Sequence, residues 1–221
     1  MKRAAALRAI AEVRDGMVVG LGSGSTAGFA LEGLAERVAD GLRIVGIPTS
    51  DATAALARRL AIPLASFDQH RRIDLTIDGA DQVERVTLHL IKGLGGALLR
   101  EKIVAAASTR LIVAVDESKL VDRLGGRTAL PVEIVPFGWH TTIDRLTALG
   151  CVPQLRRTGG QPFTTDGGNY IADCALREIP DPVALEARLS SVVGVIETGL
   201  FIGMASTIMV GRPAGVEIVE R

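Results

Sequence analysis

The sequence predicts an α/β fold, in which an open, mostly parallel β-sheet is covered by helices and a second, smaller α+β domain follows. In the first part of the chain, short runs of β-branched residues alternate with stretches rich in Ala, Leu and Arg, a pattern typical of strand–helix–strand units. After Asp122 the order becomes strand, helix, strand, strand, helix, strand, which is the plan of a ferredoxin-like domain. We therefore expect one domain at residues 1–129 and 199–221, and the smaller α+β domain at residues 130–198.

The first domain is expected to contain an amphipathic helix ahead of Met17, and then five strands and three helices before the chain leaves it. The expected strands are Met17–Gly22, Arg43–Gly46, Ile73–Ile77, Val86–Ile91 and Leu111–Val115. The expected helices are Ser25–Val38, Asp51–Leu60 and Ala97–Ala107, with Ser50 or Asp51 as the cap of the second one.

The smaller domain is expected to contain four strands and two helices. The strands are Pro131–Val135, Cys151–Leu155, Tyr170–Ala175 and Val192–Ile196, and the helices are His140–Leu149 and Pro182–Leu189. The chain is then expected to return to the first domain through strands at Phe201–Val210 and Val216–Val219.

The composition excludes several classes of protein. Lys plus Arg and Asp plus Glu both total 25, so no basic excess indicates a nucleic-acid partner. The longest uncharged apolar run, Thr198–Gly211, is shorter than the roughly 18–20 residues that a membrane span needs. Cys151 and Cys174 lack metal-ligand spacing, and although a disulfide is left open, a reducing cytoplasm is the simpler interpretation. We expect a cytoplasmic protein without membrane or nucleic-acid partners.

Gly20–Thr26 is a glycine-rich turn between the first expected strand and helix. Glycines allow a sharp turn, and the exposed N–H groups at a helix start can bind a phosphate, with Ser23, Ser25 and Thr26 as further donors. The turn lacks the Gly-Lys-Ser/Thr of a nucleotide-binding P-loop and the third glycine of a dinucleotide fingerprint. A phosphomonoester fits it better, and a simple strand-to-helix turn is the alternative.

Asp78-Gly79-Ala80-Asp81 follows the expected strand Ile73–Ile77. Carboxylates at strand C-termini in an open α/β sheet face the crevice where ligands bind, although aspartates that cap turns are the alternative. A divalent metal would need a further ligand, and His70, His89 and His140 are scattered through the chain. Thr49 and Ser50, after the second strand, are expected near the same edge.

Lys92–Lys102 combines a lysine at a strand end, a glycine loop and a helix that carries Glu101. The glycines let a substrate approach the backbone closely. Most glutamates on helices are solvated surface groups, and that is the alternative here. Four small residues leading into a surface helix have no structural reason, so the loop favours a site with one cation and one carboxylate.

Asp116-Glu117-Ser118-Lys119 follows the expected strand Leu111–Val115, and Lys119 could reach an anionic ligand. All four segments therefore fall at predicted strand C-termini, where ligand sites of open α/β sheets occur. Together they provide phosphate-binding amides, carboxylates and lysines without a Ser–His or Cys–His pair. This inventory suits proton abstraction next to a carbonyl.

The motifs GLGSGSTA, DGAD, KGLGGALLREKIVA and DESKLV, in this order, resemble ribose-5-phosphate isomerases of the A type, and PVEIVP and GLF continue the resemblance over nearly the whole chain. The resemblance implies a Rossmann-like domain with a smaller α+β domain, no cofactor, no metal, and a homo-oligomer, with a dimer favoured. It also implies a sugar phosphate as substrate and a role in the non-oxidative pentose phosphate pathway.

The resemblance places the family's catalytic base on Glu101. It places the substrate-binding positions on Ser23, Gly24, Ser25, Thr26, Asp78, Gly79, Ala80, Asp81, Lys92, Gly93, Leu94, Gly95 and Lys119. The expected mechanism is proton transfer by Glu101 between C2 and C1, with Lys92 and loop amides stabilising the enediolate and Asp81 or Asp78 moving the hydroxyl proton.

The chain departs from the family pattern at three positions, with Ser23 for a frequent Thr, Gln82 for Glu and Leu94 for Gly. Rival interpretations are a sugar-phosphate sensor, an aminosugar-phosphate deaminase and an acyl-CoA transferase on a similar scaffold. A sensor would be expected to carry a helix-turn-helix ahead of its first strand, and a deaminase a His-centred acid–base apparatus. The sequence favours the isomerase.

Overall fold

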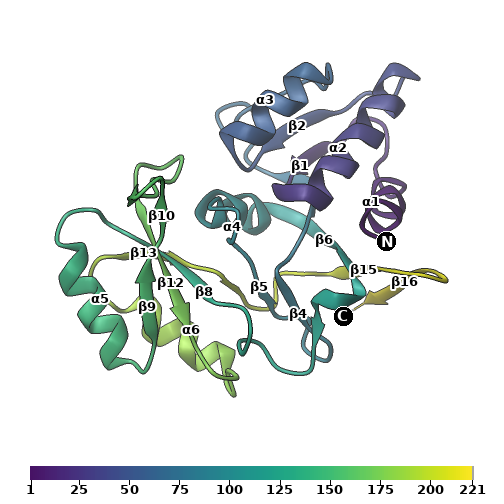
Figure 1. Ribbon diagram of the computed structural model, residues 1–221. Coiled ribbons are helices and arrows are strands. Elements are labelled where there is room, and N and C mark those ends of the chain that lie inside the picture. The colour runs from purple at the N-terminus through teal and green to yellow at the C-terminus, as the bar shows by residue number, and fades with distance from the viewer. Residues whose placement is uncertain (221) are drawn as a thin grey trace. The chain divides into compact units, whose positions relative to one another are not determined.

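The computed structural model describes residues 1–220, which form two compact units (Figure 1). The first unit contains Met1–Ala80, Arg100–Leu120 and the chain from Gly203 onward. The second contains Asp81–Leu99 and Val121–Ile202. The second unit thus includes the whole of the smaller domain expected at residues 130–198, together with the stretch 81–99.

The first unit is built on a six-stranded sheet in the order β16-β15-β6-β3-β1-β2. Its strands are β1 (Val18–Leu21), β2 (Val45–Pro48), β3 (Ile73–Asp78), β6 (Ser108–Asp116), β15 (Thr207–Arg212) and β16 (Gly215–Glu220). Every neighbouring pair is parallel except β15 with β16. This confirms the predicted open, mostly parallel sheet.

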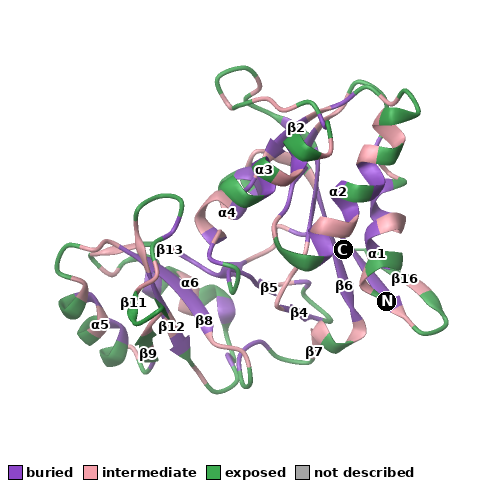
Figure 2. Cartoon of the chain, turned by 45° about the horizontal axis from the view of Figure 1, so that its top comes forward, coloured by how far each residue is buried: buried purple, intermediate pink, exposed green. Residues whose placement is uncertain are grey.

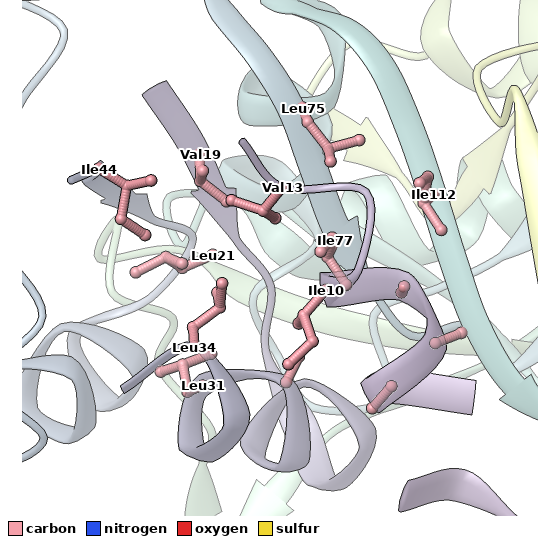
Figure 3. Close-up of a cluster of buried hydrophobic side chains, with 14 of the residues drawn as sticks. Ile10, Val13, Val19, Leu21, Leu31, Leu34, Ile44, Leu75, Ile77 and Ile112 are labelled. Atoms are coloured by element: carbon pink, nitrogen blue, oxygen red, sulfur yellow. The ribbon is translucent and has the colours of Figure 1, made fainter. Parts of the chain in front are cut away.

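Three helices cover one face of this sheet: α1 (Lys2–Ile10), α2 (Gly24–Ala39) and α3 (Asp51–Arg59). Their apolar residues share one core with the sheet, in which Leu31 and Leu34 of α2 lie beside Val19 and Leu21 of β1 (Figure 3). The residues along the second half of β6 are buried (Figure 2). A strand covered on both faces is apolar throughout, which explains the continuous run LIVAV.

The helix α4 (Leu98–Ala106) packs on the opposite face. Val104 shares a core cluster with Ile47 of β2 and Ile73 of β3. Gly20 of β1 makes this close packing possible, because a Cβ there would lie 1.8 Å from Thr76 Oγ1 and 2.8 Å from Val104 Cγ1. A glycine inside a strand commonly marks such a close approach.

The strand order changes direction next to β1, because β2 lies on one side of it and β3 on the other. In open α/β sheets, ligands bind outside the carboxyl ends of the strands at this switch point. The turn after β1 and the Asp78 end of β3 therefore occupy the position that the topology favours for a ligand.

The second unit contains an antiparallel four-stranded sheet in the order β13-β8-β12-β9. The strands are β8 (Leu130–Ile134), β9 (Val152–Leu155), β12 (Tyr170–Ala175) and β13 (Val195–Thr198), and α5 (Trp139–Ala148) and α6 (Pro182–Ser190) complete it. Leu146 of α5 and Leu189 of α6 join the same core as the sheet, which also holds the free thiols Cys151 and Cys174. This order confirms the predicted ferredoxin-like plan.

A third sheet, in the order β14-β5-β4-β7, corrects one expected strand. Its strands are β4 (Gln82–Glu84), β5 (Leu90–Ile91), β7 (Leu120–Val121) and β14 (Leu200–Phe201). The predicted strand Val86–Ile91 was wrong in its first half, because a turn closes from Glu84 O to Leu88 N over 3.0 Å and leaves Val86 90% exposed. The small hairpin of β10 (Arg157–Thr158) and β11 (Gln161–Pro162) was not predicted.

Two short observations complete the fold. A 3₁₀ turn, Glu117–Lys119, follows β6. Within residues 1–220, no helix is long and apolar enough to cross a membrane.

Candidate functional site

Asp78 ends β3 with a buried carboxylate, only 2% exposed. Its Oδ1 accepts hydrogen bonds from the backbone N–H groups of Ser23, at 3.1 Å, and Gly79, at 2.7 Å. Gly22 is required beside it, because a Cβ there would lie 2.3 Å from the same oxygen. The two amides hold this carboxylate at the carboxyl ends of β1 and β3, the predicted position.

A cluster of hydroxyl groups fixes the turn after β1 to the end of β2. Ser23 Oγ lies 2.7 Å from Thr49 Oγ1, 3.0 Å from Ser50 Oγ and 3.2 Å from Thr53 Oγ1. Thr49 and Thr53 also donate to the backbone carbonyls of Leu21 and Gly22, both at 3.0 Å. Thr49 and Ser50 were expected near this edge, whereas Thr53 was missed because it lies one turn inside α3.

The N-terminus of α2 offers an anion site. The helix begins at Gly24, whose φ of +87° brings Ser25 and Thr26 into its first turn. Lys2 Nζ lies 3.3 Å from Ser25 Oγ and 4.0 Å from Asp116 Oδ2. Unpaired N–H groups, the helix dipole and a nearby ammonium all favour a bound phosphate. Lys2 was missed because a single lysine outside any motif carries no sequence signal.

Asp116 ends β6 and organises the cations around this site. Burial raises its pKa, but the hydrogen bonds from the Ser118 side chain and backbone, with the charges of Lys2 and Lys119, outweigh burial and hold the pKa below its usual value. Asp116 is therefore ionised at neutral pH. Its negative charge attracts Lys2, and the charge of Lys119 also acts on it, so two lysines lie near this carboxylate.

Glu101 lies in the first turn of α4 and is 5% exposed. The far end of α4 lies at the amino end of β3, where Ile73 N donates to Ala107 O at 3.0 Å. The first turn therefore points toward the carboxyl ends of the strands, and an Arg100–Asp51 ion pair of 2.7 Å ties it to the start of α3. Glu101 shares a helix face with Val104, three residues later, which packs on the sheet. The alternative of a solvated surface glutamate is thus excluded.

Within the second unit, Asp81 contacts the glycine loop 92–96. Its Oδ2 accepts a hydrogen bond from Leu94 N at 3.0 Å, and its own N–H donates to Ile91 O at 2.8 Å. The Leu94 side chain is 46% exposed, so it does not fill the loop. The carboxylate and the loop are therefore held together within this unit.

Lys92 follows β5 and is 3% exposed. Its N–H donates to Gly199 O at 2.9 Å, and its ammonium lies 5.5 Å from the centre of the Phe201 ring. A cation over an aromatic face is stabilised electrostatically. The lysine side chain is thus held in a buried position at the start of the glycine loop.

Gln82, which replaces a family Glu, is part of the framework. Its side-chain amide donates to Gly125 O and accepts from Gly125 N, both at 2.8 Å. An amide pairs with both the N–H and the C=O of Gly125, which an ionised carboxylate, having no donor, cannot do.

The predicted site residues thus form two sets, one in each unit. The first unit contains Ser23, Gly24, Ser25, Thr26, Asp78, Gly79, Ala80, Glu101 and Lys119; the second contains Asp81, Lys92, Gly93, Leu94 and Gly95. In the described part of the chain, no group of three or more His, Cys, Asp or Glu side chains could hold a metal ion.

Comparisons with known proteins agree on one family. A family model described as ribose 5-phosphate isomerase A (phosphoriboisomerase A) matches residues 45–215. The ribose-5-phosphate isomerase A of Gloeobacter violaceus is 56% identical over 219 residues, which cover 99% of this chain and 95% of the relative.

Solved structures agree over the full chain. That of ribose 5-phosphate isomerase A from Methanocaldococcus jannaschii has a TM-score of 0.95 at 38% identity, covering 100% of this chain and 98% of the other. A D-ribose-5-phosphate isomerase in complex with phospho-erythronic acid also gives 0.95, at 40% identity, with 100% and 97% covered.

Proposed function

The chain belongs to the ribose 5-phosphate isomerase A family, and we propose from this that it interconverts D-ribose 5-phosphate and D-ribulose 5-phosphate through an enediolate. The observation that carries the proposal is a carboxylate, Glu101, buried on the sheet-facing side of α4 toward the carboxyl ends of the strands. A buried carboxylate in that position suits a proton carrier better than a surface ion pair.

The phosphate group is held at the start of α2. Backbone N–H groups of the first helical turn, the hydroxyls of Ser25 and Thr26, and the ammonium groups of Lys2 and Lys119 provide the donors and charges. These contacts do not change during the reaction, so they bind substrate and transition state equally and act mainly on KM.

Glu101 carries out the proton transfer. Its carboxylate removes the proton from C2 of the open-chain aldose and delivers it to C1, which yields the ketose without a net change of redox state. A positioned acid–base group contributes about 10²–10⁴ in rate. The burial of Glu101 supports this role, because water would otherwise compete for the proton.

Lys92 and the amides of the glycine loop stabilise the oxygen that becomes negative in the enediolate. Charged and backbone donors fixed before the reaction lower the barrier without reorganisation. Asp81 moves the hydroxyl proton between the two oxygens, and Asp78, fixed by two amides, assists the opening of the furanose ring. The hydrogen bond between Asp81 and Leu94 N supports a common role for the carboxylate and the loop.

The test is a ketose assay of the purified chain with ribose 5-phosphate in the presence of a chelator. Ribulose 5-phosphate should form at undiminished rate, and deuterium from solvent should enter the product. Phospho-erythronic acid should inhibit, because its planar carboxylate resembles the planar, anionic enediolate. Absence of ketose would refute the function, and a product without solvent deuterium would favour a hydride shift instead.

The same membership supports four wider proposals. The enzyme works in the cytoplasm, in the non-oxidative pentose phosphate pathway, without metal or cofactor, and as a homodimer. Light scattering of the protein as it elutes from a size-exclusion column measures the mass of the oligomer. A mass equal to that of one 23.2 kDa chain would refute the homodimer.

A further inference from the structure

Arg156, between β9 and β10 of the second unit, makes contacts that the proposed mechanism does not use. Its Nη1 donates to two successive carbonyls of the glycine loop, Gly93 O at 3.2 Å and Leu94 O at 3.0 Å. We propose that Arg156 is a positioning residue of the isomerase, which orients the loop amides toward the reacting oxygen. The proposal rests on the proposed function and adds to it a residue whose hydrogen bonds set the geometry of the loop.

The first argument concerns the peptide between Gly93 and Leu94, which is held at both ends. Arg156 binds its carbonyl oxygen, and the carboxylate of Asp81 accepts from its N–H at 3.0 Å. The C=O and N–H of a planar trans peptide point in opposite directions. Arg156 and Asp81 therefore form hydrogen bonds to opposite edges of one peptide group, and these bonds fix the orientation of that group.

The second argument concerns the next peptide along the loop. Its carbonyl, Leu94 O, also faces Arg156, so the N–H of Gly95 must point away from Arg156, toward the side on which Asp81 lies. An N–H fixed in this direction is the kind of donor that stabilises a developing oxyanion. If the loop turned over, the carbonyl would replace the donor and repel the negative charge.

The third argument is that the guanidinium itself is immobilised. Its Nε donates to Asp173 Oδ2 at 2.8 Å and its Nη2 to the other carboxylate oxygen, so the pair is bidentate. The Phe163 ring lies 5.7 Å from the guanidinium carbon, and the Arg156 side chain is only 14% exposed. A planar fork with five donors can bind a carboxylate and two carbonyls at once, which an ammonium cannot do in this geometry.

The test compares Arg156→Ala with Arg157→Ala. Arg157 is the exposed neighbour that donates to Gly160 O in the hairpin, so its loss removes the same charge without touching the loop. We expect Arg156→Ala to lower kcat about 10–100-fold, because small misplacements of reacting groups have effects of this size. KM should stay within about threefold, since the phosphate site is in the first unit.

Two further measurements separate positioning from a loss of structure. Arg156 lines an open groove of about 630 Å³ together with Trp139 and Gln154, so added guanidinium can reach the vacated position. Millimolar guanidinium should restore part of the rate of Arg156→Ala, whereas ammonium should not, and the wild-type enzyme should not respond. Affinity for phospho-erythronic acid should fall with kcat, while affinity for inorganic phosphate should not.

The remaining variants keep the proposal refutable. Arg156→Ala/Asp173→Asn removes the carboxylate left unpaired, and should regain melting temperature without regaining kcat. Three results would overturn the proposal: recovery of kcat in the double variant, absence of rescue of Arg156→Ala by guanidinium, or an equal loss of affinity for phospho-erythronic acid and for inorganic phosphate. If Arg156→Ala does not fold, Arg156→Lys provides the same measurements, with a smaller expected loss of kcat. An inactive wild type would refute the function itself, whereas an active wild type with Arg156→Ala equal to Arg157→Ala would refute this inference alone.

Discussion

The loops Gly20–Thr26 and Lys92–Gly96 both follow strands and both contain glycines, but different chemistry holds them in place. In the first, hydroxyls of Ser23 and Thr53 and the carbonyl of Gly22 form most of the contacts, and the Asp78 carboxylate adds one by accepting from Ser23 N–H. In the second, the side chains of Arg156 and Asp81 bind the backbone directly from its two sides. The first loop begins a helix of 16 residues, whereas the second contains Leu94, which is 46% exposed.

The difference indicates a division of work. A helix start fixed mainly by hydroxyl groups presents a constant positive potential, which suits a phosphate that does not change during the reaction. Charged groups around a small loop provide donors for a charge that appears only in the transition state. Substitutions around the first loop should therefore change KM, and substitutions around the second loop and on α4 should change kcat.

The largest effect is expected from Glu101→Gln. The amide cannot accept the C2 proton, so kcat should fall at least about 10²–10⁴-fold with a small change of KM. The control is Glu32→Gln, an exposed position on α2. Steady-state assays with ribose 5-phosphate measure both constants, and near-normal turnover of Glu101→Gln would remove this residue from the role.

The next effect is expected from Lys92→Met, which keeps the apolar stem over Phe201 and removes the cation. Loss of a donor to a developing oxyanion lowers kcat by about 10²–10³-fold. KM should change much less. If the variant keeps its melting temperature and its KM rises while kcat stays constant, Lys92 belongs with the phosphate contacts. That result would contradict the assignment of the second loop to kcat.

A smaller effect is expected from Lys2→Met. Because this lysine is half-buried at Ser25 and Asp116, its loss should raise KM by about 3–10-fold, the range of a screened charge near a binding site, and leave kcat unchanged. The wild-type KM should rise with salt and approach that of the variant. Arg3→Met, an exposed neighbour, is the matched control, and a fall in kcat for Lys2→Met would contradict the division of work.

The smallest effect is expected from Asp116→Asn, measured as stability against pH. The pKa of Asp116 is lower in the folded chain than its ordinary value, which it has in the unfolded chain. Its ionised form therefore stabilises the fold at every pH above that ordinary pKa. This contribution disappears as the pH falls through the folded pKa. At pH 7 the variant should lose about 1 kcal/mol of unfolding free energy, the value of a hydrogen-bonded charge. Denaturation midpoints of both proteins should converge in acid, and a constant difference would contradict the assignment.

The sequence predicted those parts of the fold that local patterns determine. Alternation of strands and helices gave the parallel sheet, and the run LIVAV gave β6, because periodicity and length are local properties. The stretch 84–91 was misjudged, because Leu88 adopts a positive φ of 56° that a β-rich sequence conceals. Tertiary context overrode β propensity there.

The predictable part of the site was the part that motifs carry. Ser23, Asp78, Asp81 and Lys92 lie in glycine-containing segments at strand ends, and Glu101 lies on the helix that follows one of them, an arrangement whose spacing alone indicates a ligand site. Lys2 and Arg156 were not found, because each reaches its partner across a long sequence separation and neither lies in a motif. Such contacts depend on tertiary packing, which a single sequence does not display.

The missing side chain of Gly20 has a consequence for the reach of the enzyme. The height of α4 above the sheet is fixed by a residue that has no atoms to occupy that space, since a single methyl group there would meet Thr76 and Val104 at once. The thickness of this layer in turn sets how far residue 101, on the same helix, stands above the sheet. Gly20, which has no side chain, thus helps to set the position of a carboxylate on the helix that packs over it.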